Sequence, residues 1–220
     1  MIKAVIFDMD GLLIDSEPLW RRAQVRAFES AGIDAITEAE FHNTKGIGVI
    51  NAVKQWHHLK PWRQPSQQEV VKLIVEELLQ LIEEEGRLLP GVLETLDLCR
   101  RESLPMALAS SSAYRVIDKV VDGMAIRDYF KVIYSGEDEE HNKPHPGVFI
   151  STAKRLETEP RNCLVFEDSP SGVLAAKAAR MKCVAVPIPL EKNHPFIKTA
   201  DIVLDSLKEF DEAALVGLQQ

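Results

Sequence analysis

The stretch that decides the fold is Phe7-Asp8-Met9-Asp10-Gly11-Leu12-Leu13, close to the start of the sequence. It follows an apolar run, residues 2–7, which one lysine interrupts and which is typical of a buried strand. Asp8 and Asp10 therefore stand where that strand must end, and the glycine after them lets the chain turn. Burying two anions there is costly unless a cation compensates them. For this pair alone, a turn capped by aspartate is the commoner explanation.

A second acidic pair occurs in the same setting further along the chain. Residues 163–166 form a short apolar run typical of a buried parallel strand, and Glu167-Asp168 follows at its end. Ser169-Pro170 then opens a helix, with serine as the N-cap and proline in the first turn. Two acidic pairs at two strand ends favour a functional site over two unrelated turns.

Three serines and one lysine complete the pattern. Residues 106–109 predict another strand, which ends in Ser110-Ser111-Ser112, and Lys143 precedes a helical run at 148–156. Strands that alternate with helices imply a parallel sheet, and ligands bind such sheets beyond the carboxyl ends of the strands. We therefore expect the acidic pairs, a hydroxyl and the lysine to converge at one end of one sheet.

The chain reads as a core that a helical insert interrupts. No strand pattern occurs between residues 15 and 88, whereas further strands are predicted at 132–134, 182–186 and 202–204. The predicted fold is α/β: a Rossmann-like parallel sheet core with an inserted all-helical cap domain. We expect the core at residues 1–14 and 89–220 and the cap at 15–88, where a lid could sequester chemistry from water.

Within the insert, local signals predict three helices. Ser16 and Pro18 open the first, which runs to about residue 31 and ends at Gly32. Apolar residues at helical spacing mark a second over about 47–56. Residues 66–69, Ser-Gln-Gln-Glu, form a capping box that starts the third.

Composition sets further bounds. A chain of 220 residues can build one large core and a smaller domain. A formal charge of −8 argues against non-specific nucleic-acid binding, which needs a basic face. No signal peptide is evident, and no apolar run approaches the roughly 20 residues that span a bilayer. The three distant cysteines indicate reduced core residues. We expect a cytoplasmic monomer with no nucleic-acid or membrane partner.

The motifs together resemble a known family over nearly the whole chain. Their order and spacing are similar to the four motifs of the haloacid dehalogenase superfamily of phosphotransferases, carried here by Asp8-x-Asp10, Ser110, Lys143 and Glu167-Asp168. Residues 15–20, Asp-Ser-Glu-Pro-Leu-Trp, and Pro61-Trp62 followed by Pro65-Ser66 resemble the branch of 2-deoxyglucose-6-phosphate and hexitol phosphatases. That branch neighbours the β-phosphoglucomutases.

The resemblance implies roles for the acidic residues. Asp8 would be the nucleophile and Asp10 the general acid and then the base, with an aspartyl-phosphate intermediate. Magnesium would be the cofactor, held by the Asp8 side chain, the Asp10 backbone carbonyl and Asp168, with Glu167 assisting directly or through water. The alternative for Asp168 is a carboxylate that merely favours a helix N-terminus.

The resemblance also implies a phosphate site. Ser110 would hold a phosphoryl oxygen, the Ser111 amide would add a donor at a helix start, and Lys143 would neutralise the phosphoryl group together with Asp8. Three consecutive serines leave the register open by one residue.

Sugar selection is expected in the cap, with Trp20, Lys45 and Asn51 as candidate substrate-binding residues, although Trp20 could be a packing residue. β-Phosphoglucomutases carry a cap histidine soon after the first motif and an arginine shortly after a Lys-Gly pair. Here Trp20 occupies the first region and Ile-Gly-Val follows Lys45-Gly46, so the cationic grip on a second phosphate is missing. Gly147 stands where the family usually has aspartate.

The resemblance therefore predicts a Mg²⁺-dependent phosphatase of small sugar or polyol phosphates, such as 2-deoxyglucose 6-phosphate or hexitol phosphates. The alternatives are a β-phosphoglucomutase-type hexose phosphate mutase and, less favoured, a non-catalytic phosphate-binding module. An intact Asp8 and Asp10 pair argues against the last, and Asp10 also argues against carbon–halogen cleavage.

Overall fold

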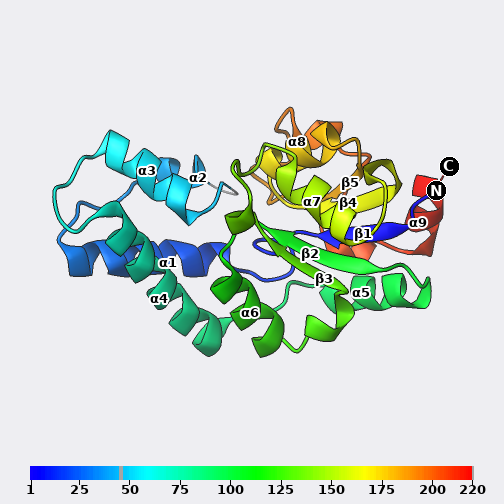
Figure 1. Ribbon diagram of the computed structural model, residues 1–220, viewed down its shortest axis with the longest axis horizontal. Coiled ribbons are helices and arrows are strands. Elements are labelled where there is room, and N and C mark those ends of the chain that lie inside the picture. Colours follow the sequence, from blue (N-terminus) through cyan, green and yellow to red (C-terminus); the bar gives the residue numbers. More distant parts are fainter. Residues whose placement is uncertain (45–46, 220) are drawn as a thin grey trace.

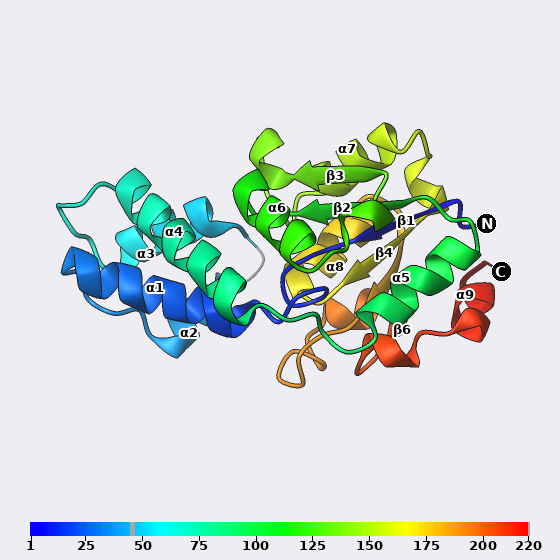
Figure 2. The same ribbon diagram turned by 90° about the horizontal axis from the view of Figure 1, so that it is seen from below.

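Six short strands form one parallel sheet in the order β3-β2-β1-β4-β5-β6; β1 to β5 are labelled in Figure 1 and β6 in Figure 2. The computed structural model describes residues 1–44 and 47–219. The strands lie where the sequence predicts them, and the last two form one edge of the sheet: β1 Ala4–Phe7, β2 Met106–Ser110, β3 Val132–Ser135, β4 Cys163–Glu167, β5 Lys182–Ala185 and β6 Ile202–Val203. The predicted α/β fold with a parallel sheet is confirmed.

Helices cover both faces of the sheet because successive side chains of each strand point to opposite faces. Ala4 and Ile6 of β1 pack in one apolar cluster with α7 (Gly147–Arg155) and α8 (Pro170–Ala178). The alternate residues of β1 pack in a second cluster with the helices of the opposite face, α5 Val92–Arg101, α6 Tyr114–Gly123 and α9 Glu212–Gln219. The three cysteines are free and buried in these clusters, as predicted.

Four helices lie together beside the sheet, at one end of the molecule (Figures 1 and 2). Their bounds are α1 Glu17–Ala31, α2 Glu38–His42, α3 Val49–Leu59 and α4 Gln67–Glu85. The first ends at Gly32, whose φ of 65° is left-handed, and the fourth starts at the predicted capping box. Helix α2 was not predicted, although Thr37 and Glu40 form a second capping box.

Two linker segments, around residues 14 and 88, connect these helices to the sheet and run side by side. Ile14 and Leu88 form an antiparallel bridge, and the Leu89 amide donates to the Leu13 carbonyl over 3.0 Å. A further contact joins α4 to α6, where Lys119 Nζ lies 2.7 Å from Glu83 Oε2. The helical part is therefore tied to the sheet both at its linkers and along one helix.

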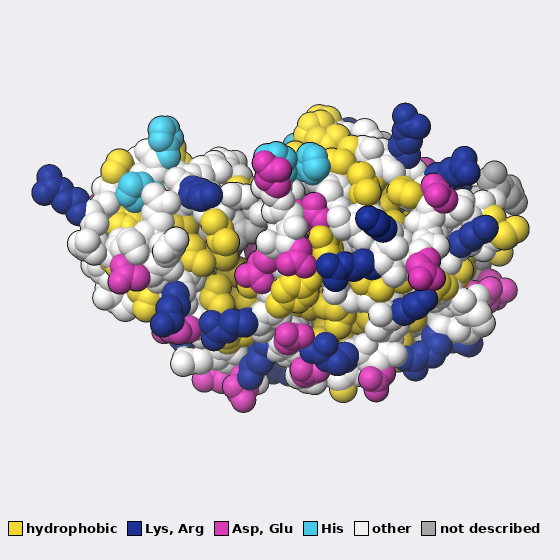
Figure 3. Space-filling model, in the orientation of Figure 1, with side chains coloured by type: hydrophobic (Ala, Val, Ile, Leu, Met, Phe, Trp, Pro, Cys, Tyr) yellow, Lys and Arg dark blue, Asp and Glu magenta, His cyan; other side chains and the backbone are white. Residues whose placement is uncertain are grey.

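The surface carries charges of both signs. On the face drawn in Figure 3, basic and acidic side chains are interspersed, without a broad basic area among the described residues. Within residues 1–44 and 47–219, no helix has the length and apolar character needed to cross a membrane.

Candidate active site

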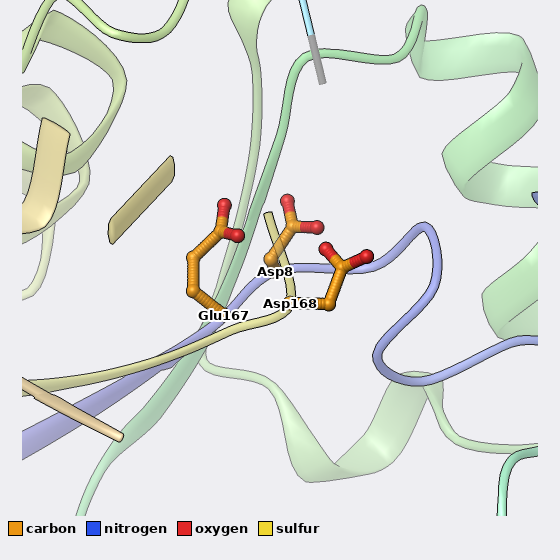
Figure 4. A group of neighbouring side chains, drawn as sticks. All are labelled: Asp8, Glu167 and Asp168. Carbon is orange, nitrogen blue, oxygen red and sulfur yellow. The ribbon is translucent and has the colours of Figure 1, made fainter. Parts of the chain in front are cut away.

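The acidic residues meet because β1 and β4 are neighbours in register. Phe7 pairs with Phe166, and their rings stack with centroids 4.8 Å apart. The residues that follow, Asp8 on one strand and Glu167-Asp168 on the other, therefore emerge side by side at the carboxyl edge of the sheet. All three are buried, and one oxygen from each lies within 4.8 Å of the others (Figure 4).

Lys143 binds two of these carboxylates at once. Its Nζ lies 2.6 Å from Asp8 Oδ1 and 2.6 Å from Glu167 Oε1. Burial by itself would lower the pKa of Lys143, but the charges of Asp8 and Glu167 outweigh that effect and raise the pKa above its ordinary value. The lysine is therefore charged in the folded protein and neutralises part of the acidic cluster.

The cluster retains an excess of negative charge among its described residues. Three carboxylates stand against the single ammonium of Lys143. Burial, outweighing the attraction of Lys143 and reinforced by Glu167 and Asp168, raises the pKa of Asp8 well above its usual range. Buried carboxylate oxygens with excess negative charge are the donor set that a divalent cation such as Mg²⁺ prefers. The residues therefore fit a bound metal.

Two glycines make room for the cluster. Gly11 has a φ of 79°, and a Cβ there would overlap the Asp168 carboxylate, so the turn after Asp10 needs a residue without a side chain. A Cβ at Gly172, in the first turn of α8, would overlap the Glu167 carboxylate. That carboxylate is also held by the amide and hydroxyl of Ser169, over 2.8 and 3.0 Å. Ser169 is the N-cap of α8, as predicted.

The Asp10 side chain accepts four hydrogen bonds from residues that the structure describes. Its Oδ1 accepts from Ser16 Oγ and Trp20 Nε1, both over 2.8 Å. Its Oδ2 accepts from Ser112 Oγ over 2.6 Å and from Ser110 Oγ over 3.3 Å. Ser16 is the N-cap residue of α1, and Pro18 lies in its first turn, as predicted, but the Ser16 hydroxyl binds Asp10 and makes no hydrogen bond to the helix amides. Ser16 and Trp20 belong to the cap, and Ser110 and Ser112 belong to the core, so both parts bind the same carboxylate.

Sequence reasoning did not assign Ser112 to the site. Three consecutive serines left the register open, and the structure brings both Ser110 and Ser112 to Asp10, two residues apart. The Ser112 amide in turn donates to Ser110 Oγ over 3.0 Å. The signal was present in the sequence, but which hydroxyls face Asp10 depends on how the chain turns after β2.

These residues surround one cavity between the sheet edge and the helical part. The core lines it with Asp8, Asp10, Gly11, Ser110, Ser111, Ser112, Lys143, Asp168 and Ser169. The other wall combines aromatic, aliphatic and small polar side chains of the cap, among them Trp20, Phe41, Thr44, Val49, Ala52 and Trp56. Of these six residues, only Trp20 was predicted to belong to the site. The spacing of Val49, Ala52 and Trp56 on one face of α3 was the available signal.

The three cap candidates fall in different places. Trp20 lines the cavity and donates its indole N–H to Asp10. Asn51 lies on α3, donates its side-chain amide to the Ile47 carbonyl over 3.3 Å and is not among the described residues that line the cavity. Lys45 lies outside the described residues.

The structure also gives a reason for Gly147. A Cβ at this position would overlap the Glu139 carboxylate, which also accepts a hydrogen bond from the Tyr134 hydroxyl over 2.6 Å. Glu139 thereby places its negative charge at the N-terminus of α7, where the helix dipole favours it. The carboxylate beside this helix end therefore comes from the loop before α7.

Comparison with known proteins gives consistent matches over most of the chain. The haloacid dehalogenase-like hydrolase family matches residues 5–186. Hexitol phosphatase B of Escherichia coli K12 is 42% identical over 216 residues, which cover 98% of this chain and 97% of that protein.

Two solved structures extend the comparison to the fold. The structure of CbbY from Rhodobacter sphaeroides in complex with phosphate has a TM-score of 0.90 and 25% identity, over 98% of this chain and 100% of that chain. β-Phosphoglucomutase of Clostridium difficile has a TM-score of 0.85 and 26% identity, over 99% and 96%.

Proposed function

The chain belongs to the haloacid dehalogenase-like hydrolases and is a phosphoric monoester hydrolase, and we propose that it hydrolyses small sugar or polyol phosphates through an aspartyl-phosphate on Asp8. One observation carries the proposal. Asp8 and Asp10 face a cavity together with Lys143 and the serines after β2. Hexitol phosphatase B supports hexitol phosphates as one substrate class.

In the first half of the reaction, Asp8 attacks the phosphorus atom and the bond from phosphorus to the ester oxygen breaks. Lys143, 2.6 Å from Asp8 Oδ1, lies where it can neutralise the phosphoryl oxygens, and Ser110 and the Ser111 amide supply hydrogen-bond donors. Asp10 gives its proton to the leaving alkoxide. The products are a free alcohol and a phosphorylated Asp8.

In the second half, Asp10 takes a proton from a water molecule that attacks the phosphorus of the aspartyl-phosphate. The bond between Asp8 and phosphorus then breaks, so that inorganic phosphate leaves and the carboxylate of Asp8 is restored. The roles of Asp10 as acid and then as base require its carboxyl group to reach both the leaving oxygen and the attacking water. The cavity contains Asp8 and Asp10 together, as this requires.

Magnesium is the cofactor in this proposal. Asp8, Asp168 and the Asp10 backbone carbonyl would hold it, and the ion would neutralise charge on the phosphoryl oxygens. Both Glu167 oxygens already accept hydrogen bonds, one from Lys143 and one from Ser169. We therefore propose that Glu167 assists the metal through water and mainly fixes the lysine.

The cap would select the substrate, because the described core residues of the cavity are suited to phosphate and metal. Trp20, Lys45 and Asn51 remain the predicted determinants, and Phe41 and Val49 join them as residues that line the cavity. Substitution of a determinant should change relative kcat/KM among hexose, deoxyhexose and hexitol phosphates while Mg²⁺ affinity stays constant. We also propose a cytoplasmic monomer, which size-exclusion chromatography can test for oligomeric state.

A hexose phosphate mutase is the second candidate, because the β-phosphoglucomutase structure is similar over almost the whole chain. A mutase would interconvert β-glucose 1-phosphate and glucose 6-phosphate and release little phosphate. A binding module without turnover would bind phosphate analogues and hydrolyse none.

One experiment separates these functions. The purified protein is incubated with a panel of sugar and polyol phosphates, with Mg²⁺ or with a chelator, and both free phosphate and isomers are measured. We expect phosphate release that the chelator abolishes and that Asp8→Asn removes. Asp34→Asn, at an exposed position in the cap, is the matched control and should be active. Rapid isomer exchange without phosphate release would favour the mutase, and no turnover of any ester would contradict the proposal.

A further inference from the structure

The Asp10 carboxylate is held from two sides, by the core at one oxygen and by the cap at the other. Ser112 donates to Oδ2 and Trp20 donates to Oδ1. We infer that Ser112 and Trp20 are positioning residues, which fix the Asp10 side chain where it can protonate the leaving alkoxide. This inference rests on the proposed function, in which Asp10 is the general acid.

The surroundings of Ser112 direct its hydroxyl to Asp10. The residue is 5% exposed, its amide donates to Ser110 Oγ over 3.0 Å, and its carbonyl accepts from Ser135 Oγ over 2.6 Å. A serine before a helix often caps it, but here Ala113 is the N-cap of α6, and the Tyr114 amide at the start of that helix donates to Glu137 Oε2 over 2.8 Å. The bond to Asp10, at 2.6 Å, is the shortest of the four that Asp10 accepts.

Trp20 plays the corresponding part from the cap. The indoles of Trp56 and Trp62 donate to backbone carbonyls within the cap, over 3.3 and 2.9 Å. The indole of Trp20 instead donates across to Asp10 in the core, over 2.8 Å. The indole N–H of Trp20 therefore binds the Asp10 carboxylate. We assign Trp20 two roles, positioning Asp10 and lining the cavity.

The consequence depends on the leaving group of the substrate. A sugar alkoxide is a poor leaving group, so its departure needs a proton from a well-placed acid, whereas 4-nitrophenolate leaves readily without one. A general acid that is misplaced should therefore slow hydrolysis of sugar phosphates and spare 4-nitrophenyl phosphate. A loss of folding, of metal or of phosphate binding would slow both.

The test compares Ser112→Ala and Trp20→Phe with wild type on the best sugar or polyol phosphate and on 4-nitrophenyl phosphate, with Mg²⁺ present. A hydrogen bond to a charged group is worth about 10- to 100-fold, so kcat for the sugar phosphate should fall by that factor. The kcat for 4-nitrophenyl phosphate should change by less than about threefold. Asp10→Asn should show the same selectivity with a larger loss, and Ser112→Thr, which keeps the hydroxyl, should recover activity.

Two matched controls remove the same groups elsewhere. Ser206→Ala deletes a hydroxyl that donates to the Pro90 carbonyl, and Trp62→Phe deletes an indole N–H that stays within the cap. Both should leave the ratio of the two activities unchanged.

Equal losses on both esters, or no loss on either, would overturn the positioning role. A wild-type protein that hydrolyses neither ester would overturn the proposed function itself and the inference with it. Activity on 4-nitrophenyl phosphate also reports whether each variant has folded.

Discussion

Replacing Lys143 by methionine tests the charge balance of the site most directly. The lysine side chain is 2% exposed, and its Nζ lies 2.6 Å from both Asp8 and Glu167, whose side chains are 7% and 0% exposed. Methionine has a similar length but carries no charge and no donor. The variant leaves the carboxylates of Asp8, Glu167 and Asp168 clustered without this ammonium.

The expected loss of stability follows from this burial. Breaking a buried ion pair by removing one partner costs about 3–5 kcal/mol. In a protein of this size, 1 kcal/mol shifts Tm by about 2–4 °C, so the metal-free variant should melt about 6–20 °C below wild type. The raised pKa of Lys143 means that its contribution is fully present below the ordinary value of 10.5 and is lost only as the pH rises through the raised value. A melt at neutral pH therefore measures the whole effect.

Thermal unfolding followed by circular dichroism, with and without Mg²⁺, measures the loss. The metal should raise the Tm of Lys143→Met more than that of wild type, because it replaces positive charge that only the variant lacks. Lys177→Met removes an exposed ion pair with Asp201 and should cost less than about 1 kcal/mol. The double variant Lys143→Met/Glu167→Gln should recover part of the loss, since it also removes one uncompensated carboxylate.

Phosphatase activity of Lys143→Met should fall by about a hundredfold or more, because the phosphoryl oxygens lose a preorganised cation. An unchanged Tm without metal, or equal Mg²⁺ effects on variant and wild type, would refute the charge-balance reasoning.

Three further predictions concern other positions of the chain. Gly147→Asp should lower the free energy of unfolding by about 1–3 kcal/mol, because its side chain overlaps a carboxylate; Glu139→Ala in the same chain should restore most of the loss in a denaturant titration. Hydrogen bonds from Lys60 and Thr37, together with the charge of Lys60, lower the pKa of Glu40 to about 2. Glu40 should therefore stabilise the protein above pH 4.5 and lose that contribution as the pH falls toward 2. Glu40→Gln should flatten the acid-unfolding curve over that window. Gly172→Ala should reduce both Tm and activity by displacing the carboxylate that holds the active-site lysine, whereas Gly217→Ala, which meets open space in α9, should keep activity and raise Tm slightly.

The sequence by itself was enough for the sheet and for the acidic centre of the site. Each strand was a short apolar run, and each acidic pair stood directly after one. Because parallel strands end at the same edge, the sequence was sufficient to place Asp8 and Asp168 at one edge of the sheet, whereas the pairing of β1 with β4 makes them neighbours. These are consequences of local pattern and of one topological rule.

What the sequence could not decide were contacts that depend on angles between elements. Helix α2 shows the limit for short elements, since five residues give almost no helical periodicity and its capping box at Thr37 is a weak signal alone. That both Ser110 and Ser112 face Asp10 depends on a turn of only a few residues, where an error of one position reverses the direction of a side chain.

The cap and the loops depended on tertiary structure still more. Trp20 reaches Asp10 because α1 leaves the linker at one particular angle, whereas Asn51 on α3 bonds back to its own helix. Glu139 fills the space beside Gly147 because the loop between β3 and α7 folds back on itself. Local pattern records which face of an element is apolar, but it does not record how two packed elements are oriented, because many orientations bury the same apolar face.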